Sequence, residues 1–239
     1  MSIINKICWL GHSAVFLSSE NDIIAIDPWL NHNPVCPKQY HSPQHLDLIV
    51  LTHGHSDHAG DVIRLVKETN CQVCATFELA NLLCQNGVPQ RNLIGMNKGG
   101  TVKWHDFTVS LTHAVHSNSY TLTNGKTEYA GEACGVIIND GKNCFYHAGD
   151  TDLFSDMELI RELYKPNYAF LPIGDLFTMN PRSAAMAAKL CGSGTVIPIH
   201  YGTFPALTGA AEDFCKYCNE IAPETEVKIL KAGEALSLE

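Results

Sequence analysis

A short apolar segment that runs into a cluster of histidine and aspartate constrains this fold more than any other part of the sequence. Residues 45–52, HLDLIVLT, have the nearly unbroken hydrophobicity of a strand that is buried on both faces. His53, His55, Asp57 and His58 follow directly, within the run HGHSDHAGD. Imidazole and carboxylate groups at this density suit zinc, iron or manganese. The sequence therefore predicts a covered strand whose carboxyl end opens onto a metal site.

The spacing within this cluster suits two ion positions rather than one. We expect the residues after the strand to form a loop, with His53 and His55 pointing one way and the other two ligands turning toward a second position. A histidine-rich surface loop is the alternative interpretation. Chance rarely places H-x-H-x-D-H at the end of a strand, so the pattern favours metal binding.

The rest of the chain divides into two halves, each of which begins with short β segments and ends in strand–helix alternation. Strands are expected at 3–10, 13–19, 22–27, 45–52, 72–75, 92–95, 101–104, 107–112, 134–139, 143–147, 168–172, 195–199, 226–230 and 235–238. Helices are expected at 61–68, 77–86, 155–164, 180–191 and 209–221. This order predicts the α/β class, with two facing sheets and helices outside them, a four-layer αββα sandwich. No linker or repeat interrupts it, so we expect a single domain over residues 1–239.

Two helix starts carry local signals. Ser155 and Glu158 have the spacing of a capping box. Asn180 and Pro181 suit the N-cap and the first helical position. Residues 28–45 and 117–131 are expected to be loops, and loops on a rigid scaffold commonly form the walls of a substrate site.

Charge and hydropathy exclude several classes of protein. The chain has 239 residues and a formal net charge of -9, with 16 basic against 25 acidic residues. A general nucleic-acid or membrane-surface binder usually presents a basic face, so neither partner is expected. No apolar stretch reaches the ~20 residues of a membrane span, and the first residues do not resemble a signal peptide. A cytoplasmic protein with a small-molecule substrate is the prediction, and a homo-oligomer is compatible with it.

The ten cysteines are expected to be reduced thiols. Two C-x-x-C pairs occur, Cys71 with Cys74 and Cys215 with Cys218, but they are too far apart in sequence for a zinc ribbon. The first pair also falls in a predicted strand, where residues three apart face opposite sides. A structural zinc or redox role is therefore disfavoured.

The motif H-x-H-x-D-H at the end of a strand resembles the metallo-β-lactamase superfamily. The resemblance implies an αββα sandwich with a two-metal site at one edge and three further ligands at later strand ends. On this pattern one metal belongs to His53, His55 and His116, the other to Asp57, His58 and His200, with Asp150 between them. His113 is the rival of His116, but it lies within the predicted strand and is expected to pack or support.

Further motifs resemble a branch of compact metal-dependent hydrolases, related to L-ascorbate-6-phosphate lactonase and N-acyl-phosphatidylethanolamine phospholipase D. They are WLGHS at 9–13, DPW at 27–29, FTMNP at 177–181 and KAGE at 231–234. The resemblance implies a dinuclear hydrolase of an ester, lactone or phosphodiester-type substrate. Zinc is the favoured metal, with manganese or iron as alternatives. Phe177 and Met179 are expected either to line the pocket or to pack in the core.

Four further residues have candidate roles beside the metals. His12 follows a turn glycine, and the resemblance places it near the metals, where it could donate to an oxyanion or protonate a leaving group; an ordinary turn histidine is the alternative. Asp57 could also orient water or take up a proton. Asp27 is a candidate acceptor behind a metal histidine, or else a turn-former. His147 is expected to support the site rather than to bind metal.

The favoured function is hydrolysis by metal-activated water. The alternative is a metal-stabilised binding or sensor module with little or no turnover, because a fold does not determine a function. A purely structural zinc site is disfavoured, since it would use only about four ligands. The remaining histidines, expected in exposed loops, are His32, His41, His45 and His105.

Overall fold

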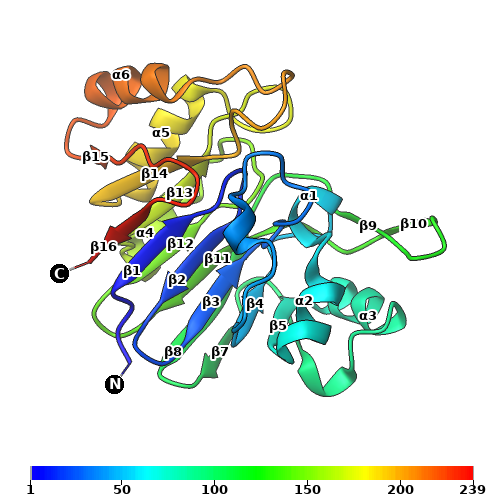
Figure 1. The fold of residues 1–239 in the computed structure, drawn as a ribbon. Coiled ribbons are helices and arrows are strands. Elements are labelled where there is room, and N and C mark those ends of the chain that lie inside the picture. Colours follow the sequence, from blue (N-terminus) through cyan, green and yellow to red (C-terminus); the bar gives the residue numbers. More distant parts are fainter. Residues whose placement is uncertain (1, 239) are drawn as a thin grey trace.

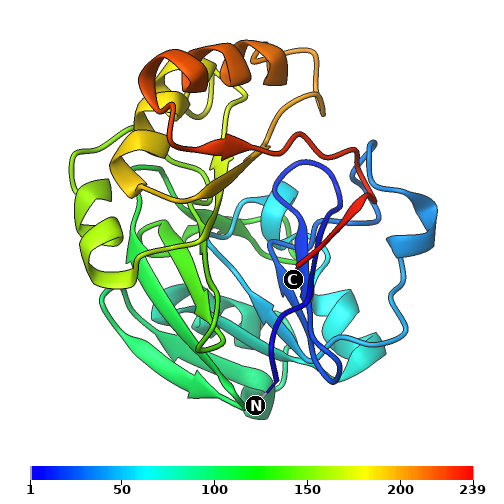
Figure 2. The ribbon, with the colours of Figure 1, turned by 90° about the vertical axis from the view of Figure 1, so that its left-hand side faces the viewer.

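Two seven-stranded sheets face each other in the computed structural model, which describes residues 2–238 (Figure 1). The first sheet has the order β16-β1-β2-β3-β4-β5-β6, and the second has the order β15-β14-β13-β12-β11-β8-β7. Helices cover both outer faces, and Figure 2 shows the two sheets between them. The predicted four-layer αββα sandwich is therefore confirmed.

The strands agree closely with the sequence pattern. The first sheet contains β1 (Lys6–Trp9), β2 (Val15–Ser18), β3 (Ile23–Ile26), β4 (Leu48–Val50), β5 (Gln72–Thr76), β6 (Leu93–Met96) and β16 (Ala235–Ser237). The second contains β7 (Thr101–Trp104), β8 (Phe107–His113), β11 (Cys134–Asn139), β12 (Cys144–His147), β13 (Tyr168–Pro172), β14 (Thr195–Ile199) and β15 (Glu226–Val227). The last strand of the chain returns to the first sheet, where it pairs antiparallel with β1.

Helices α2 and α3 pack on the first sheet, and α4, α5 and α6 pack on the second. The helices are α1 (Ser56–Ala59), α2 (Val62–Thr69), α3 (Phe77–Gln85), α4 (Met157–Tyr164), α5 (Pro181–Cys191) and α6 (Ala211–Ile221), with 3-10 turns at Lys38–Tyr40 and Gln90–Asn92. Each of the helices in residues 2–238 is too short or too polar to cross a lipid bilayer.

Strand direction brings the predicted site to one edge of the sandwich. In each sheet an antiparallel half leads into a parallel half, β3 to β6 in the first and β12 to β15 in the second. Strand β8 runs in the same direction as β12, because both are antiparallel to β11. Strands β4, β8, β12 and β14 therefore end at the edge where the chain continues into the predicted ligands.

The core between the sheets is built from alternate residues of facing strands. Its fully buried members include Ile24, Val50, Leu111, Phe145 and Phe170. Separate apolar clusters lie between each sheet and its helices. Burial of apolar surface in three such layers stabilises the sandwich and holds the strand ends in place.

Replacing Leu111 by alanine should lower the free energy of unfolding by about 3 kcal/mol, because the side chain is fully buried between the sheets and its loss leaves a cavity. The same substitution at Leu163 is a matched control. That side chain is 72% exposed on α4, so the change should stay within about 0.5 kcal/mol. Urea unfolding of both variants measures the difference, and equal effects would contradict the core assignment.

Three local expectations were wrong. Residues 117–131 are not a plain loop: they form a hairpin of β9 (Ser119–Thr121) and β10 (Thr127–Tyr129), which projects from the body in Figure 1. The turn contains Asn124-Gly125, a strong hairpin signal.

The capping box is absent, because Asp156 is the N-cap of α4 and the Ser155 hydroxyl bonds to its carboxylate instead. Strand β15 is shorter than expected, because Leu230 packs between the sheets. The N-cap of α5 is as predicted, with the Asn180 side chain accepting from the Ser183 amide.

Candidate metal centre

The H-x-H-x-D-H segment is part loop and part helical turn. After β4 the chain has no regular secondary structure through His53 and His55, and α1 then begins at Ser56. The amides of His58 and Ala59 both donate to the His55 carbonyl, which closes this turn. The expectation of a loop throughout was therefore wrong, and the turn has a consequence for geometry. It directs the later side chains away from the first two histidines.

Three histidines form one compact group. His53 and His55 precede α1, and His116 follows β8. One potential ligand nitrogen from each lies within 4.8 Å of the others. The Nε2 atom of His53 is 2.9 Å from Nδ1 of His55. Burial lowers the pKa of all three imidazoles, so they are neutral at pH 7 and their lone pairs are available to a cation.

A second group lies beside the first. It contains Asp57 and His58 from α1, His200 from the end of β14, and His12, again with ligand-type atoms within 4.8 Å of one another. The residues predicted for the second ion therefore lie together, and His12 lies with them. The side chain of Asp57 is 30% exposed, so this group is open to solvent on that side.

Asp150 lies between the two groups. Its Oδ2 atom is 3.1 Å from Nε2 of His200 and 3.6 Å from Nε2 of His116. Oδ2 is also 4.0 Å from Nε2 of His53, and Oδ1 is 3.3 Å from Nε2 of His58. Burial alone would raise the pKa of this carboxyl, but His200 and His58 hold it well below its usual range. One carboxylate thus faces imidazoles of both groups, as expected of a bridging ligand.

Close approach of β4 and the segment after β12 makes this position possible. Gly149 has a positive φ of 63°, and a Cβ atom there would lie 2.7 Å from the Cβ of Thr52. Any other residue at 149 would push the two strand ends apart. Glycine therefore allows Asp150 to reach the histidines that follow β4.

Unpartnered polar atoms show that the groups fit a cation. Within residues 2–238, Nε2 of His58, Oδ1 of Asp150 and both ring nitrogens of His200 are buried without a hydrogen-bond partner. The distances from Asp150 to these rings are short, yet the atoms are not aligned as hydrogen bonds. Buried polar atoms are normally satisfied. A set of nitrogen and carboxylate donors that converge without bonding one another fits a bound metal ion.

Hydrogen bonds that lead to Asp27 determine which ring nitrogen of His58 and of His53 faces Asp150. Its Oδ2 atom accepts from Nδ1 of His58 at 2.8 Å and from the hydroxyl of Thr52 at 2.6 Å. Since the Thr52 hydroxyl donates to Asp27, it accepts from Nδ1 of His53, 2.9 Å away. Both histidines then carry a proton on Nδ1 and turn Nε2 toward Asp150, which leaves Nε2 as the atom that would bind a metal ion. The predicted acceptor role of Asp27 is confirmed, and Thr52 is a relay that sequence reasoning missed.

The electrostatics of His58 also favour a positive charge at this point. Burial disfavours the imidazolium, but the neighbouring carboxylates Asp150 and Asp27 outweigh it and raise the pKa of His58 well above its usual range. A proton or a metal ion between His58 and Asp150 would satisfy this demand.

His12 is fully buried at a left-handed turn, with a φ of 53°. Nε2 of His12 is 3.1 Å from Oδ2 of Asp57, and Nδ1 is 3.0 Å from the hydroxyl of Thr203. The pKa of Asp57 lies below its usual range because the His12 hydrogen bond and the nearby His58 outweigh its burial. An ionised carboxylate only accepts, so Nε2 of His12 carries the proton and Nδ1 accepts from Thr203. Burial lowers the pKa of His12 to about 4, so the ring is neutral.

His147 supports the backbone beside the site. Its Nε2 atom is 2.9 Å from the Ser13 carbonyl, and its Nδ1 accepts from the Gly149 amide at 3.1 Å. Both ring nitrogens are thereby used, as expected of a residue that supports the site. His113 is exposed at the end of β8 and packs edge-on against Phe154.

The remaining candidates lie outside the two groups. Met179 is buried in the core under α5, whereas Phe177 is 58% exposed. All ten cysteines are unpaired, and Cys71 and Cys74 face opposite sides of the first sheet, as predicted. The loop 28–45 places Trp29 edge-on to His12, with ring centroids 5.4 Å apart.

Comparison with known proteins places this geometry in a family. The family model for the beta-lactamase superfamily domain matches residues 23–201. A UPF0173 metal-dependent hydrolase from Koribacter versatilis is 42% identical over 235 residues, which cover 97% of each chain. The chain belongs to this family of metal-dependent hydrolases.

Relatives in this family extend across bacteria and archaea. The UPF0173 metal-dependent hydrolase of the archaeon Methanosarcina mazei is also 42% identical over 235 residues, covering 98% of each chain. Among solved structures, Igni18, a metallo hydrolase from the hyperthermophilic archaeon Ignicoccus hospitalis, superposes with a TM-score of 0.87. It is 33% identical and covers 99% of each chain. The likeness therefore extends over the whole sandwich, including all the strand ends that carry the histidine and aspartate groups.

Proposed function

We propose that this protein hydrolyses an ester, lactone or phosphodiester-type bond of a small molecule with the help of two divalent transition-metal ions, zinc being favoured. The observation that carries the proposal is the position of Asp150, whose two oxygens face imidazoles of both groups at 3.1–4.0 Å. His53, His55 and His116 would hold one ion, and Asp57, His58 and His200 the other. Such ions lower the pKa of bound water to about 7 and stabilise developing negative charge.

The residues of the chain prepare the site for this chemistry. Asp27 and Thr52 fix the histidine tautomers before any ligand arrives, so binding costs little reorganisation. Of the two carboxylates among the candidate ligands, Asp57 is more open to solvent than Asp150, so it can orient an attacking water or receive its proton. His12 donates from Nε2 to Asp57 and so holds that carboxylate in position for proton transfer.

Elemental analysis combined with an activity screen tests the proposal. The purified protein should contain two transition-metal ions per chain and should hydrolyse at least one member of a panel of esters, lactones and phosphodiesters. A chelator should abolish turnover, and zinc, manganese or iron should restore it. Turnover that survives complete metal removal would refute the proposal. Stoichiometric metal without turnover on any class would instead indicate a binding or sensor module.

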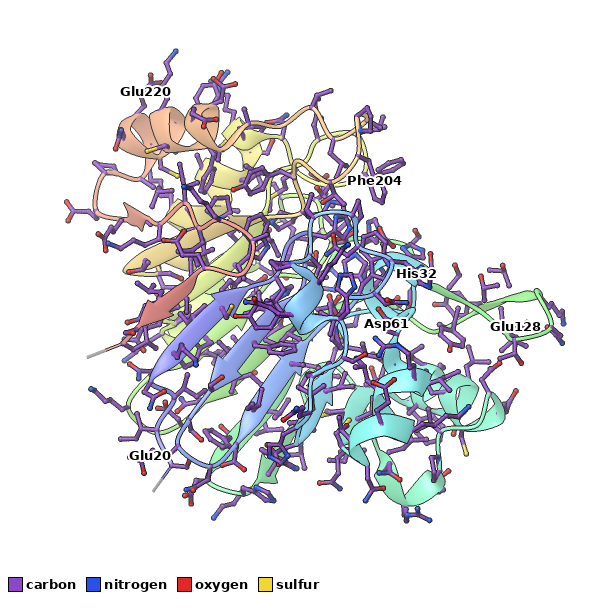
Figure 3. All side chains as sticks on the ribbon, in the orientation of Figure 1. Glu20, His32, Asp61, Glu128, Phe204 and Glu220 are labelled. Atoms are coloured by element: carbon purple, nitrogen blue, oxygen red, sulfur yellow. The ribbon has the colours of Figure 1, made fainter. Side chains whose placement is uncertain are left out.

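Replacing His12 by alanine should leave two metal ions bound and lower kcat about 10²-fold, because Asp57 loses the hydrogen bond that positions it for proton transfer. Both ions should stay bound because Nε2 of His12 already donates to Asp57 and so is not available as a ligand. His32, an exposed residue at the same edge in Figure 3, is the control, and its alanine variant should keep full activity. Loss of one metal in the His12 variant would show that His12 is a ligand. An unchanged rate would show that His12 does not contribute to catalysis.

A further inference from the structure

Two neighbouring loops at the site edge expose large apolar side chains. Residues 173–180 follow β13 and carry Leu176 and Phe177, which are 66% and 58% exposed. Residues 200–210 follow β14 and carry Phe204, which is 39% exposed. Large apolar side chains that cluster on a surface usually mark a site of contact.

Hydrogen bonds join these two loops close to their exposed apolar residues. The Gly209 amide donates to the Gly174 carbonyl at 3.3 Å, and the Thr208 hydroxyl donates to the Asp175 carboxylate at the same distance. Figure 1 shows both loops at the same end of the second sheet. We call Leu176, Phe177 and Phe204 the apolar ledge.

The backbone of the first loop is held in an unfavourable conformation. Asp175 and Leu176 are consecutive residues with φ of 63° and 48°. A branched side chain such as leucine rarely adopts the left-handed region, because its Cβ crowds the following carbonyl. The turn nevertheless holds Leu176 and Phe177 toward solvent. Strain that presents exposed apolar groups beside a site is a sign of function.

Phe204 connects the ledge to the reacting groups. Its ring centroid lies 5.7 Å from that of His12 and 5.8 Å from that of Trp29. His12 in turn bonds Asp57, whose side chain is 30% exposed. Figure 3 shows Phe204 on the side of the molecule that also carries His32. The apolar surface therefore begins one side chain away from Asp57.

We propose that the apolar ledge binds an alkyl or aryl substituent of the substrate while the polar reacting group lies at Asp57. This rests on the proposed function and narrows its substrate class to molecules with an apolar group beside the scissile bond. A phenyl ring or an alkyl chain that covers Phe204 removes apolar surface of both partners from water, which strengthens binding in proportion to chain length.

Binding of straight-chain carboxylates tests this without turnover. Butanoate and octanoate share a head group and differ only in apolar length, so calorimetric titration of the metal-loaded protein isolates the ledge. A fully buried methylene strengthens binding about fourfold, so partial burial of the longer chain should make octanoate about tenfold tighter than butanoate. Replacing Phe204 or Phe177 by serine should bring this ratio close to one, and Phe204→Leu should keep most of it.

Leu163→Ser on α4 is the matched control, because it removes an apolar side chain that is 72% exposed and lies away from the ledge. It should leave the chain-length ratio unchanged. A wild-type ratio of one, or a ratio that Phe204→Ser and Phe177→Ser do not alter, would overturn the ledge proposal. So would a dimer that the serine variants convert to monomer in ultracentrifugation with the ratio intact, which would make the ledge an interface between copies.

The calorimetric titration and a parallel activity assay together separate this proposal from the proposed function. Nitrophenyl acetate and nitrophenyl hexanoate, assayed in parallel, should show a preference for the hexanoate that falls in Phe204→Ser. A protein that hydrolyses neither ester, lactone nor phosphodiester but keeps the tenfold chain-length effect would refute hydrolysis and retain the ledge. Turnover without any chain-length effect would do the reverse.

Discussion

Replacing Asp150 by asparagine should abolish hydrolysis and leave the protein with at most one metal ion per chain. The carboxylate faces imidazoles of both groups, with Oδ1 3.3 Å from Nε2 of His58 and Oδ2 3.1 Å from Nε2 of His200. An amide keeps the size of the side chain but carries no charge, and its nitrogen cannot accept or ligate. A dinuclear site supplies several kcal/mol of transition-state stabilisation, so the rate should fall at least about 10³-fold.

Metal content by mass spectrometry and kcat on the best substrate of the screen measure this effect. Asp152→Asn is the control, because Asp152 is an exposed aspartate two residues further along the same segment. It should keep both ions and full activity. Two ions bound to the Asp150 variant, or turnover within about tenfold of wild type, would show that Asp150 does not bridge the metals; that factor corresponds to only about 1.4 kcal/mol.

The part of the site that sequence could predict is the part fixed by strand ends. His53 follows β4, His116 follows β8, Asp150 follows β12 and His200 follows β14. Apolar runs locate these strands, and parallel order brings their carboxyl ends to one edge. The convergence of widely separated residues therefore follows from local hydrophobic pattern together with the sandwich and the strand-end ligands that the resemblance implied.

Contacts between loops could not be predicted in the same way. Thr203 lies in a loop and meets His12 only because β14 ends beside the turn after β1, where the His200 amide donates to the His12 carbonyl. The apolar ledge likewise needs two loops that follow different strands to bond each other. No periodicity marks such residues, since their conformation depends on tertiary packing. Asn124-Gly125 is a different case, because a recognisable hairpin signal was present in the sequence.

Thr52 is a residue whose position beside His53 was known from the sequence but whose role could not be predicted. It directly precedes His53, so its position was available, but its role depends on the carboxylate of Asp27, which follows β3. A hydroxyl beside a histidine is common in sequences. Only the three-residue relay, seen in space, explains why it is buried there.

Replacing Asp27 by asparagine should weaken binding of both metal ions by about 10–100-fold each, the usual effect of losing an acceptor behind a metal histidine. The carboxylate accepts three hydrogen bonds: from the Thr52 amide, the Thr52 hydroxyl and Nδ1 of His58. In either orientation of an asparagine amide, its NH₂ group faces at least one of these donors. His58 then loses the partner that keeps its proton on Nδ1, and the relay through Thr52 to His53 is disturbed as well.

The two histidines belong to different groups, so a single change behind them should affect both ions. Asp140→Asn is a matched control, since Asp140 is also fully buried and accepts backbone amides, including those of Ile4 and Asn143. It should lower stability and leave metal affinity unchanged. Competition with a chromophoric chelator resolves the two binding steps. Weakening of one step alone would mean that the Thr52 relay does not orient His53, whereas equal weakening by the Asp140 control would mean that Asp27 acts through stability rather than through the tautomers of its histidines.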